Sequence, residues 1–156
     1  NPRAVVLREK DLSPEIYRKL AEEVDQICRE QDQMLILNTA PAAAAQLGMR
    51  KLHLPMSILR REGRPLDAEC VGTSIHSVEE VKEAVRLGAD YLFAGNIYET
   101  DCKKGLPGRG LDFLRQVCME SSVPVYAIGG VNEERLPEIL STGAAGGCMM
   151  SGFMKL

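Results

Sequence analysis

The chain has 156 residues, of which 45% are apolar and 26% are charged, and its formal net charge at pH 7 is −3. This composition is typical of one globular domain. A weakly acidic balance without a block of like charges gives no basis for binding a nucleic-acid backbone, and no apolar run approaches the ~20 residues that a membrane-spanning helix needs. We therefore expect neither nucleic acid nor a membrane as a partner.

The cysteines are few and scattered, and none forms a Cys-x-x-Cys pair: Cys28, Cys70, Cys102, Cys118 and Cys148. Their odd number and wide spacing predict reduced thiols rather than a disulfide framework or a structural zinc site. Reduced thiols are typical of the cytoplasm, where we expect this protein to lie. The chain opens at Asn1 without an initiator Met, so we also expect the natural protein to begin earlier.

Short apolar runs alternate with segments of helical period, which is the pattern of repeated βα units and a parallel sheet. Ser13, followed by Pro14 and Glu15, has the form of a helix start. The polar stretch 60–67 is expected to be a loop or a weak helix. In this first half the pattern predicts strands at 4–7, 34–37 and 51–54, with helices at 14–30 and 41–47.

The alternation continues through the second half. Ser77 and Glu80 form a capping-box pattern ahead of a helix, and Asn132 is expected to cap another. The run 91–95 is almost continuously apolar, as expected for a strand that is covered on both faces. The predicted strands are 69–73, 91–95, 124–128 and 147–150, and the predicted helices are 78–87, 111–120 and one that reaches residue 140.

Three glycines, Gly48, Gly88 and Gly143, each follow a helical segment and precede a strand, as left-handed helix ends do. The repeat of helix, glycine, strand and variable loop predicts an α/β fold, the TIM (βα)8 barrel. Because only seven strands are predicted, we expect residues 1–156 to be a single barrel domain that lacks its first strand and last helix. The open edges of such a sheet can pair with another chain, so a homo-oligomer is one expected outcome. An open doubly wound sheet is the alternative, but no Gly-x-Gly-x-x-Gly follows the first strand.

Small residues follow the last two predicted strands, where barrels build their active sites. Gly129 and Gly130 follow one strand, and Ser151 and Gly152 follow the next. Without large side chains, the backbone N–H groups of such residues can meet a phosphate. Turns also favour glycine, so each pair alone is a weak signal. Their occurrence after neighbouring strands favours an anion-binding site.

Polar residues follow the other strands: Arg8, Lys10, Asn38, Ser74, His76 and Asn96. Arg8 and Lys10 are spaced to project to the same side of an extended chain, where they either grip an anion or lie solvated. His76 either orients its loop or takes a direct chemical role. Glu99 and Asp101 are the only acidic pair at a strand end and share one loop, so no metal site is predicted from the residues.

Several segments together resemble the thiamine phosphate synthase superfamily, namely Arg8 to Leu12, Gly72 to His76, Gly88 to Tyr91, Lys103, Ala127 to Gly130, and Ser151. Residues 98–110 are similar to the TenI-like thiazole tautomerase branch of that superfamily. The resemblance implies a TIM barrel, a role in thiamine biosynthesis, and a small phosphorylated heterocycle as the partner.

Synthases of this family join a pyrimidine pyrophosphate to a thiazole phosphate with the help of Mg²⁺, so Mg²⁺ is expected only if this protein is a synthase. The family's two metal-holding aspartates fall at Thr39, which follows Asn38, and at Ile58. Neither residue supplies a carboxylate, so weak binding of a Mg²⁺-pyrophosphate is expected. The resemblance places four residues on the pyrophosphate side: Arg8, Lys10, Ser74 and Lys103.

The tautomerase branch converts one isomer of a carboxythiazole phosphate to the aromatic isomer, which requires proton transfer. The histidine of that branch falls at Asn96, which hydrogen-bonds but does not titrate. His76, Glu99 or Cys102 would then have to move the proton. The resulting catalytic candidates are Asn96, His76 and Lys103, and the binding candidates are Arg8, Lys10, Asn38, Ser74, Gly129, Gly130, Ser151 and Gly152.

These patterns support three functions. The leading interpretation is a TenI-like protein that binds thiazole phosphate or thiamine phosphate and acts as a thiazole tautomerase with altered acid–base residues. The second is a thiamine phosphate synthase, a transferase. The third is a non-catalytic regulatory protein that keeps the phosphate cradle without the chemistry.

Overall fold

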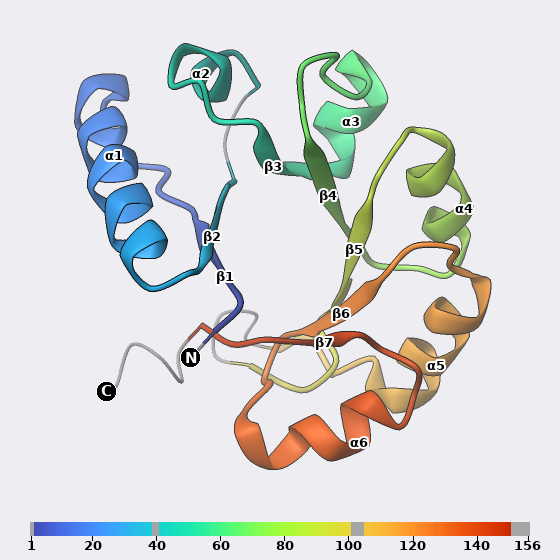
Figure 1. The fold of residues 1–156 in the computed structure, drawn as a ribbon. Coiled ribbons are helices and arrows are strands. Elements are labelled where there is room, and N and C mark those ends of the chain that lie inside the picture. Colours follow the sequence, from blue (N-terminus) through green and yellow to red (C-terminus); the bar gives the residue numbers. More distant parts are fainter. Residues whose placement is uncertain (1, 39–40, 101–104, 151–156) are drawn as a thin grey trace. The chain divides into compact units, whose positions relative to one another are not determined.

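The structure, a computed structural model, describes residues 2–38, 41–100 and 105–150. Within them, seven short strands alternate with helices along the chain (Figure 1). The chain divides into two compact units, Asn1–Val71 and Gly72–Leu156. Strands that pair within either unit run parallel, as the alternating pattern predicts.

The first unit contains three parallel strands in chain order. They are β1 (Ala4–Leu7), β2 (Met34–Leu37) and β3 (Lys51–Pro55). The connecting helices are α1 (Pro14–Glu30) and α2 (Pro41–Gln46), and α3 (Met56–Glu62) follows β3. Strand β4 (Cys70–Ile75) begins at the end of this unit.

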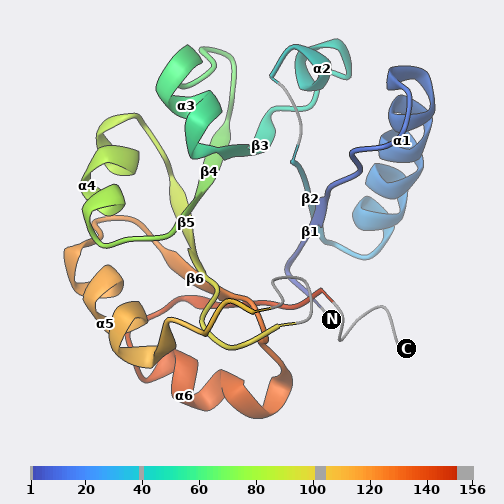
Figure 2. The ribbon, with the colours of Figure 1, turned by 180° about the vertical axis from the view of Figure 1, so that it is seen from behind.

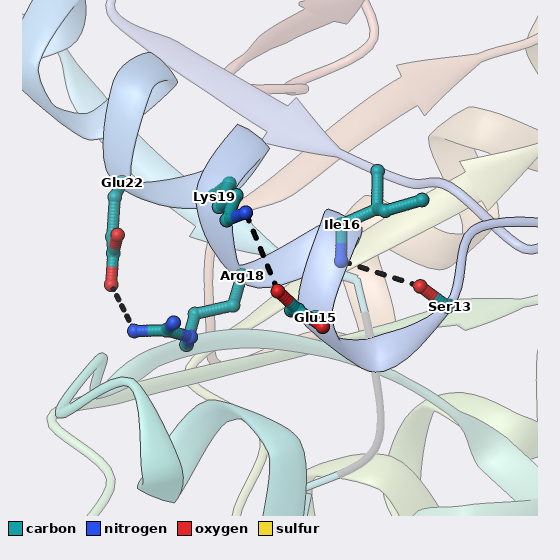
Figure 3. Close-up of polar contacts among 6 residues, drawn as sticks. All are labelled: Ser13, Glu15, Ile16, Arg18, Lys19 and Glu22. Atoms are coloured by element: carbon teal, nitrogen blue, oxygen red, sulfur yellow. Dashed lines mark hydrogen bonds and ion pairs between the residues drawn. The ribbon is translucent and has the colours of Figure 1, made fainter.

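Helix α1 begins where its capping residue predicts. The Oγ of Ser13 accepts the N–H of Ile16 at 3.4 Å, which satisfies one of the unpaired donors of the first turn. Figure 3 shows this cap together with two ion pairs along the helix, Glu15 with Lys19 at 3.3 Å and Arg18 with Glu22 at 3.2 Å. Such exposed pairs one turn apart each add only about 0.3–0.5 kcal/mol. The N-terminal cap and the buried side chains of α1 therefore stabilise this helix more than its exposed ion pairs do.

The second unit carries the remaining strands in chain order, β4, β5 (Tyr91–Gly95), β6 (Val125–Ile128) and β7 (Gly146–Cys148). The helices between them are α4 (Glu79–Arg86), α5 (Gly110–Glu120) and α6 (Leu136–Leu140), with the 3₁₀ turn η2 (Glu133–Arg135) leading into α6. Gly95 pairs with Ile128, and Ile128 pairs with Cys148.

The helices of this unit lie along one face of its strands, as Figures 1 and 2 show from opposite sides. Leu92 and Ala94 are fully buried on this face. The other face carries an aromatic cluster, in which the ring of Tyr91 lies 5.3 Å from that of Phe93 and 6.1 Å from that of Tyr126. Strand β5 is therefore covered on both faces, as its apolar run predicts.

Most predicted elements are confirmed. The strands at 4–7, 34–37 and 91–95 have the predicted bounds. Gly48, Gly88 and Gly143 have the positive φ angles of helix ends, +64°, +89° and +93°. The side chain of Asn132 accepts the N–H of Arg135 at 3.0 Å and so caps the turn into α6.

Three predictions need correction. The polar stretch 60–67 contains the end of helix α3, and this helix begins before the stretch. The buried residues Met56 and Leu59 stabilise its first turn. The charged residues after Leu59 hide this apolar pattern in the sequence. Strand β4 runs on to Ile75. In the predicted capping box, the N–H of Glu80 does approach the Oγ of Ser77 at 3.4 Å, but the Glu80 carboxylate accepts the N–H of His76, at 2.6 Å.

The aromatic cluster predicts that Gly72 cannot be enlarged. A Cβ at Gly72 would lie 1.9 Å from the Cζ of Tyr91, which is only 7% exposed and has little room to move. We expect Gly72→Ala to lower the free energy of unfolding in urea by about 1–3 kcal/mol, as overpacked cores do. In a Tyr91→Leu background the same substitution should cost less. An equal cost in both backgrounds would show that the ring is not the obstacle.

His53 predicts a pH-dependent stability. Burial lowers the pKa of this imidazole in β3 from 6.5 to about 4. Between these values the unfolded chain binds a proton that the folded chain does not, so stability falls as the pH drops from 6.5 towards 4. The difference amounts to about 3 kcal/mol once the pH is below both values. Urea titrations at pH 7.5 and pH 4.5 should show most of this loss in the wild type and a smaller loss in His53→Gln.

Candidate functional site

Backbone pairing between β5 and β6 continues beyond the ends of both strands. The N–H of Ile97 donates to the carbonyl of Ile128 at 2.9 Å, and the N–H of Tyr98 donates to the carbonyl of Gly129 at 3.1 Å. Successive carbonyls of a regular strand point in opposite directions, so two in a row cannot face the same neighbour. The chain achieves this by turning at Gly129, where φ is +93°, and at Gly130, where φ is +66°.

The same two hydrogen bonds determine the direction of the backbone N–H groups of Gly129 and Gly130. In a trans peptide the C=O and N–H groups point in opposite directions, and both peptides here are trans. Because the carbonyls of Ile128 and Gly129 face the segment after β5, the N–H groups of Gly129 and Gly130 point away from it. Neither donates to an acceptor within residues 2–38, 41–100 and 105–150. Successive N–H groups at such a corner form an anion-binding concavity.

Only glycine fits at either position of this corner. A Cβ at Gly129 would lie 2.6 Å from the Cβ of Asn96. A Cβ at Gly130 would lie 2.7 Å from both the carbonyl oxygen of Glu99 and the Cβ of Tyr98. Glycine is therefore required at both positions for the corner to pack closely against the loop after β5. The absence of side chains also leaves the two backbone N–H groups uncovered.

Asn96 shapes the loop that packs on the corner. It is 5% exposed, and its Nδ2 donates to the carbonyl of Tyr98 at 3.3 Å. Its own carbonyl accepts the N–H of Arg109 at 2.9 Å. The polar contacts of this predicted catalytic residue are therefore with backbone groups of its own loop.

His76 lies at the end of β4, next to the end of β5. Its Nδ1 is 2.8 Å from the carbonyl oxygen of Gly95, an acceptor, so the hydrogen-bond geometry assigns the proton to Nδ1. In the neutral ring, Nε2 is then the basic nitrogen. The imidazole is thereby brought beside Asn96, and a titratable group lies near the corner.

The second unit brings several predicted residues together. His76, Asn96, Gly129 and Gly130 are connected through the end of β5 by the contacts above. Ser74 lies on the aromatic face of β4, in register with Phe93. Lys103, Ser151 and Gly152 lie outside the described residues, as does Thr39, so their predicted roles stay predictions.

The first unit carries the other predicted residues. Arg8 and Lys10 are exposed beyond the end of β1, and Asn38 is half-buried, with its N–H donating to the carbonyl of Leu7 at 2.9 Å. Lys10 lines an open cavity of about 220 Å³ between the start of α1 and α2, with Tyr17, Arg18 and Gln46 among its walls. Arg8 is not part of this cavity's lining. A shared anion grip by Arg8 and Lys10 stays a prediction.

Sequence reasoning missed one cluster beside the corner. The guanidinium of Arg135 donates to the carbonyl of Gly130 and lies 4.2 Å from the centre of the Tyr98 ring. The Tyr98 hydroxyl donates to Oε1 of Glu138 at 2.5 Å. Burial and the Glu138 carboxylate raise the pKa of Tyr98 to about 12, against a smaller opposing effect of Arg135. No motif marks these residues, because they meet only when the β5 loop packs on the turn into α6.

The described residues do not supply a magnesium site. Ile58 in α3, at one of the two expected carboxylate positions, has an alkyl side chain that cannot bind a hard cation. No group of three or more His, Cys, Asp or Glu side chains suited to a metal occurs in the described ranges. Among the described helices, none has the length and apolar character needed to cross a bilayer.

Comparisons with known proteins agree on one family. A family model described as thiamine monophosphate synthase matches residues 1–153. The thiamine-phosphate synthase of Syntrophomonas wolfei is 34% identical over 160 residues, which cover 96% of this chain and 74% of the relative. The thiamine-phosphate synthase of Pyrococcus abyssi is 33% identical and covers 97% of this chain and 74% of the relative.

Solved structures give the same result for the fold. Thiamine phosphate pyrophosphorylase from Pyrococcus furiosus superposes with a TM-score of 0.82 at 28% identity, covering 99% of this chain and 75% of that one. A 3-hexulose-6-phosphate synthase superposes with a TM-score of 0.70 at 17% identity, covering 99% of this chain and 80% of that one, which shows likeness of fold alone. These likenesses confirm the predicted α/β fold of the TIM-barrel class. The described residues form seven strands, whereas a complete barrel of this class has eight.

The packing of the corner predicts unequal effects for two glycines with the same φ. Gly129 and Gly143 both have φ +93°, but a Cβ at Gly143 would make only an ordinary contact, 3.5 Å from the Cβ of Cys118. We expect Gly143→Ala to cost about 1–2 kcal/mol from backbone strain alone. Gly129→Ala adds the clash with Asn96 and should cost at least about 1 kcal/mol more in urea unfolding. Equal losses would contradict the close approach described here.

Proposed function

Because the chain belongs to the thiamine monophosphate synthase family, we propose that it takes part in thiamine phosphate synthesis and binds a thiazole phosphate at the Gly129–Gly130 corner. The observation that carries this proposal is the pair of glycine N–H groups directed away from carbonyls that are held by the β5 loop. Backbone N–H groups stabilise an anion through hydrogen bonds to its charged oxygens. A phosphate monoester is the anion that the family's thiazole carries.

The synthase reaction, which joins a pyrimidine pyrophosphate to the thiazole phosphate, is preferred to the tautomerase reaction that the sequence favoured. Relatives named thiamine-phosphate synthase are about one third identical over nearly the whole chain. The position of the tautomerase histidine holds Asn96, whose buried amide hydrogen-bonds to backbone and is not a titrating acid or base.

The sequence predictions supply the remaining residues of this proposal. The strand-end pattern assigns Ser151 and Gly152 to the phosphate, and the family resemblance assigns Arg8, Lys10, Ser74 and Lys103 to the pyrophosphate. Cationic side chains and a hydroxyl are suited to bind the charge of that group.

A tautomerase is the second candidate, favoured by one observation. With the Nδ1 proton of His76 donated to Gly95, Nε2 is the basic nitrogen beside Asn96. An imidazole in this position has a free ring nitrogen that can accept and return a proton. His76 would then take the role of the tautomerase histidine, whose position Asn96 occupies.

Two parallel assays separate these functions. The protein is incubated with thiazole phosphate and the pyrimidine pyrophosphate, with and without Mg²⁺, and separately with the non-aromatic carboxythiazole phosphate. Mass spectrometry and NMR then follow the products. We expect thiamine phosphate in the first assay and an unchanged isomer in the second. Isomerisation that His76→Gln abolishes, or that Asn96→His accelerates, would instead establish the tautomerase.

Binding measurements test the corner itself. Gly130→Ala places a methyl group against Glu99 and Tyr98 and so disturbs the aimed amides. We expect at least about tenfold weaker binding of thiazole phosphate by calorimetry, the equivalent of one lost charge-assisted hydrogen bond. Gly143→Ala is the matched control and should bind as the wild type does. Binding without turnover in either assay would identify a non-catalytic phosphate-binding protein, and no binding by the wild type would contradict the proposal.

A further inference from the structure

Arg135 holds the peptide bond that follows Gly130 at the corner. The half-buried guanidinium donates to the carbonyl of Gly130 and stacks over the ring of Tyr98 at 4.2 Å. Arginine suits this position because its planar group can donate hydrogen bonds in its plane and contact an aromatic ring with its face. The N–H of Arg135 is itself fixed by the side chain of Asn132, at 3.0 Å.

Tyr98 gives the guanidinium a rigid platform. Its backbone N–H donates to the carbonyl of Gly129, and its hydroxyl donates to Glu138 in α6. With its pKa raised to about 12, the Tyr98 hydroxyl keeps its proton near neutral pH. Tyr98 is therefore held at two points: its backbone N–H is bound to the corner, and its hydroxyl is bound to α6.

The two contacts fix the peptides on both sides of Gly130. Its preceding peptide is held through the carbonyl of Gly129 by Tyr98, and its following peptide is held through its own carbonyl by Arg135. Glycine has the greatest backbone freedom of any residue, so without these contacts Gly130 would sample many orientations. With both peptides held, the backbone of Gly130 is fixed on either side. Its N–H, which belongs to the preceding peptide, is therefore oriented before a ligand arrives, which avoids an entropic cost on binding.

We propose that Arg135 is a positioning residue for phosphate recognition, which acts by holding the Gly130 carbonyl while its guanidinium stacks on Tyr98. The inference rests on the proposed function, because it takes the Gly129–Gly130 corner as the phosphate site. Arg135 holds the peptide that follows Gly130, whose N–H is that of Val131, so it acts on the Gly130 N–H by fixing the backbone of this glycine and not by binding the phosphate itself. The ligand class it serves is a phosphate monoester.

The test uses the full chain labelled with ¹⁵N-glycine, whose 14 glycines give a simple amide spectrum. Thiazole phosphate and the unphosphorylated thiazole alcohol are titrated into the wild type, and the amide signals of Gly129 and Gly130 are followed. Calorimetry gives both dissociation constants. If the two wild-type signals do not move with thiazole phosphate, the proposed site itself is wrong, whatever Arg135 does.

Three variants then isolate the contribution of Arg135. Arg135→Met removes the donor and the charge, Arg135→Lys keeps both without the planar group, and Tyr98→Leu removes the platform and leaves Arg135 in place. Arg115→Met is the matched control, since Arg115 is a half-exposed arginine of the same unit that pairs only with Asp112 in the described structure. Circular dichroism melting confirms that each variant is folded.

We expect Arg135→Met to weaken thiazole phosphate binding about tenfold, or about 1.4 kcal/mol. Tyr98→Leu should have a similar effect, Arg135→Lys should restore most of the affinity, and the unphosphorylated alcohol should bind every variant as it binds the wild type. A purely structural role would instead lower the affinities for both ligands together. That result, or wild-type affinity in both Arg135→Met and Tyr98→Leu while the glycine signals still shift, would overturn the inference.

Discussion

Two backbone hydrogen bonds, from the N–H groups of Ile97 and Tyr98 to successive carbonyls after β6, are the constraint on which the site depends. They force a turn that only glycine can make at Gly129 and Gly130. The direction of the glycine amides then follows from peptide planarity. The phosphate binding that we propose for this corner would therefore be a consequence of how one loop packs on its neighbour.

The fold supplies this constraint by holding β5 and β6 rigidly in register. Buried side chains on one face of β5 pack beneath the helices, and Tyr91 and Phe93 fill the other face. Gly95 lies opposite Ile128 at the strand ends, so the segments beyond them begin side by side. A site at the carboxyl ends of parallel strands is the general arrangement of this fold class, and here a specific pair of strands provides it.

The sequence alone predicts much of this structure, because strand and helix patterns are local. The apolar run at β5, the cap at Ser13 and the glycine stops depend on neighbouring residues, and all are confirmed. Helix α3 was missed because its buried residue Leu59 is followed in the sequence by charged residues, which hide the apolar pattern. The Arg135–Tyr98 contact could not be predicted, since 37 residues separate the two in sequence. Asn96 was predicted as catalytic, whereas its polar contacts here are with backbone groups of its own loop, a role that only the packed loop reveals.

The most direct measurement of the central claim is a crystal structure of the full chain with thiazole phosphate bound. The account predicts phosphate oxygens within hydrogen-bonding distance, about 2.7–3.2 Å, of the backbone nitrogens of both Gly129 and Gly130. The Arg135 guanidinium should remain on the Gly130 carbonyl in the same structure. A phosphate bound elsewhere, with the two glycine nitrogens donating to other protein atoms, would contradict it.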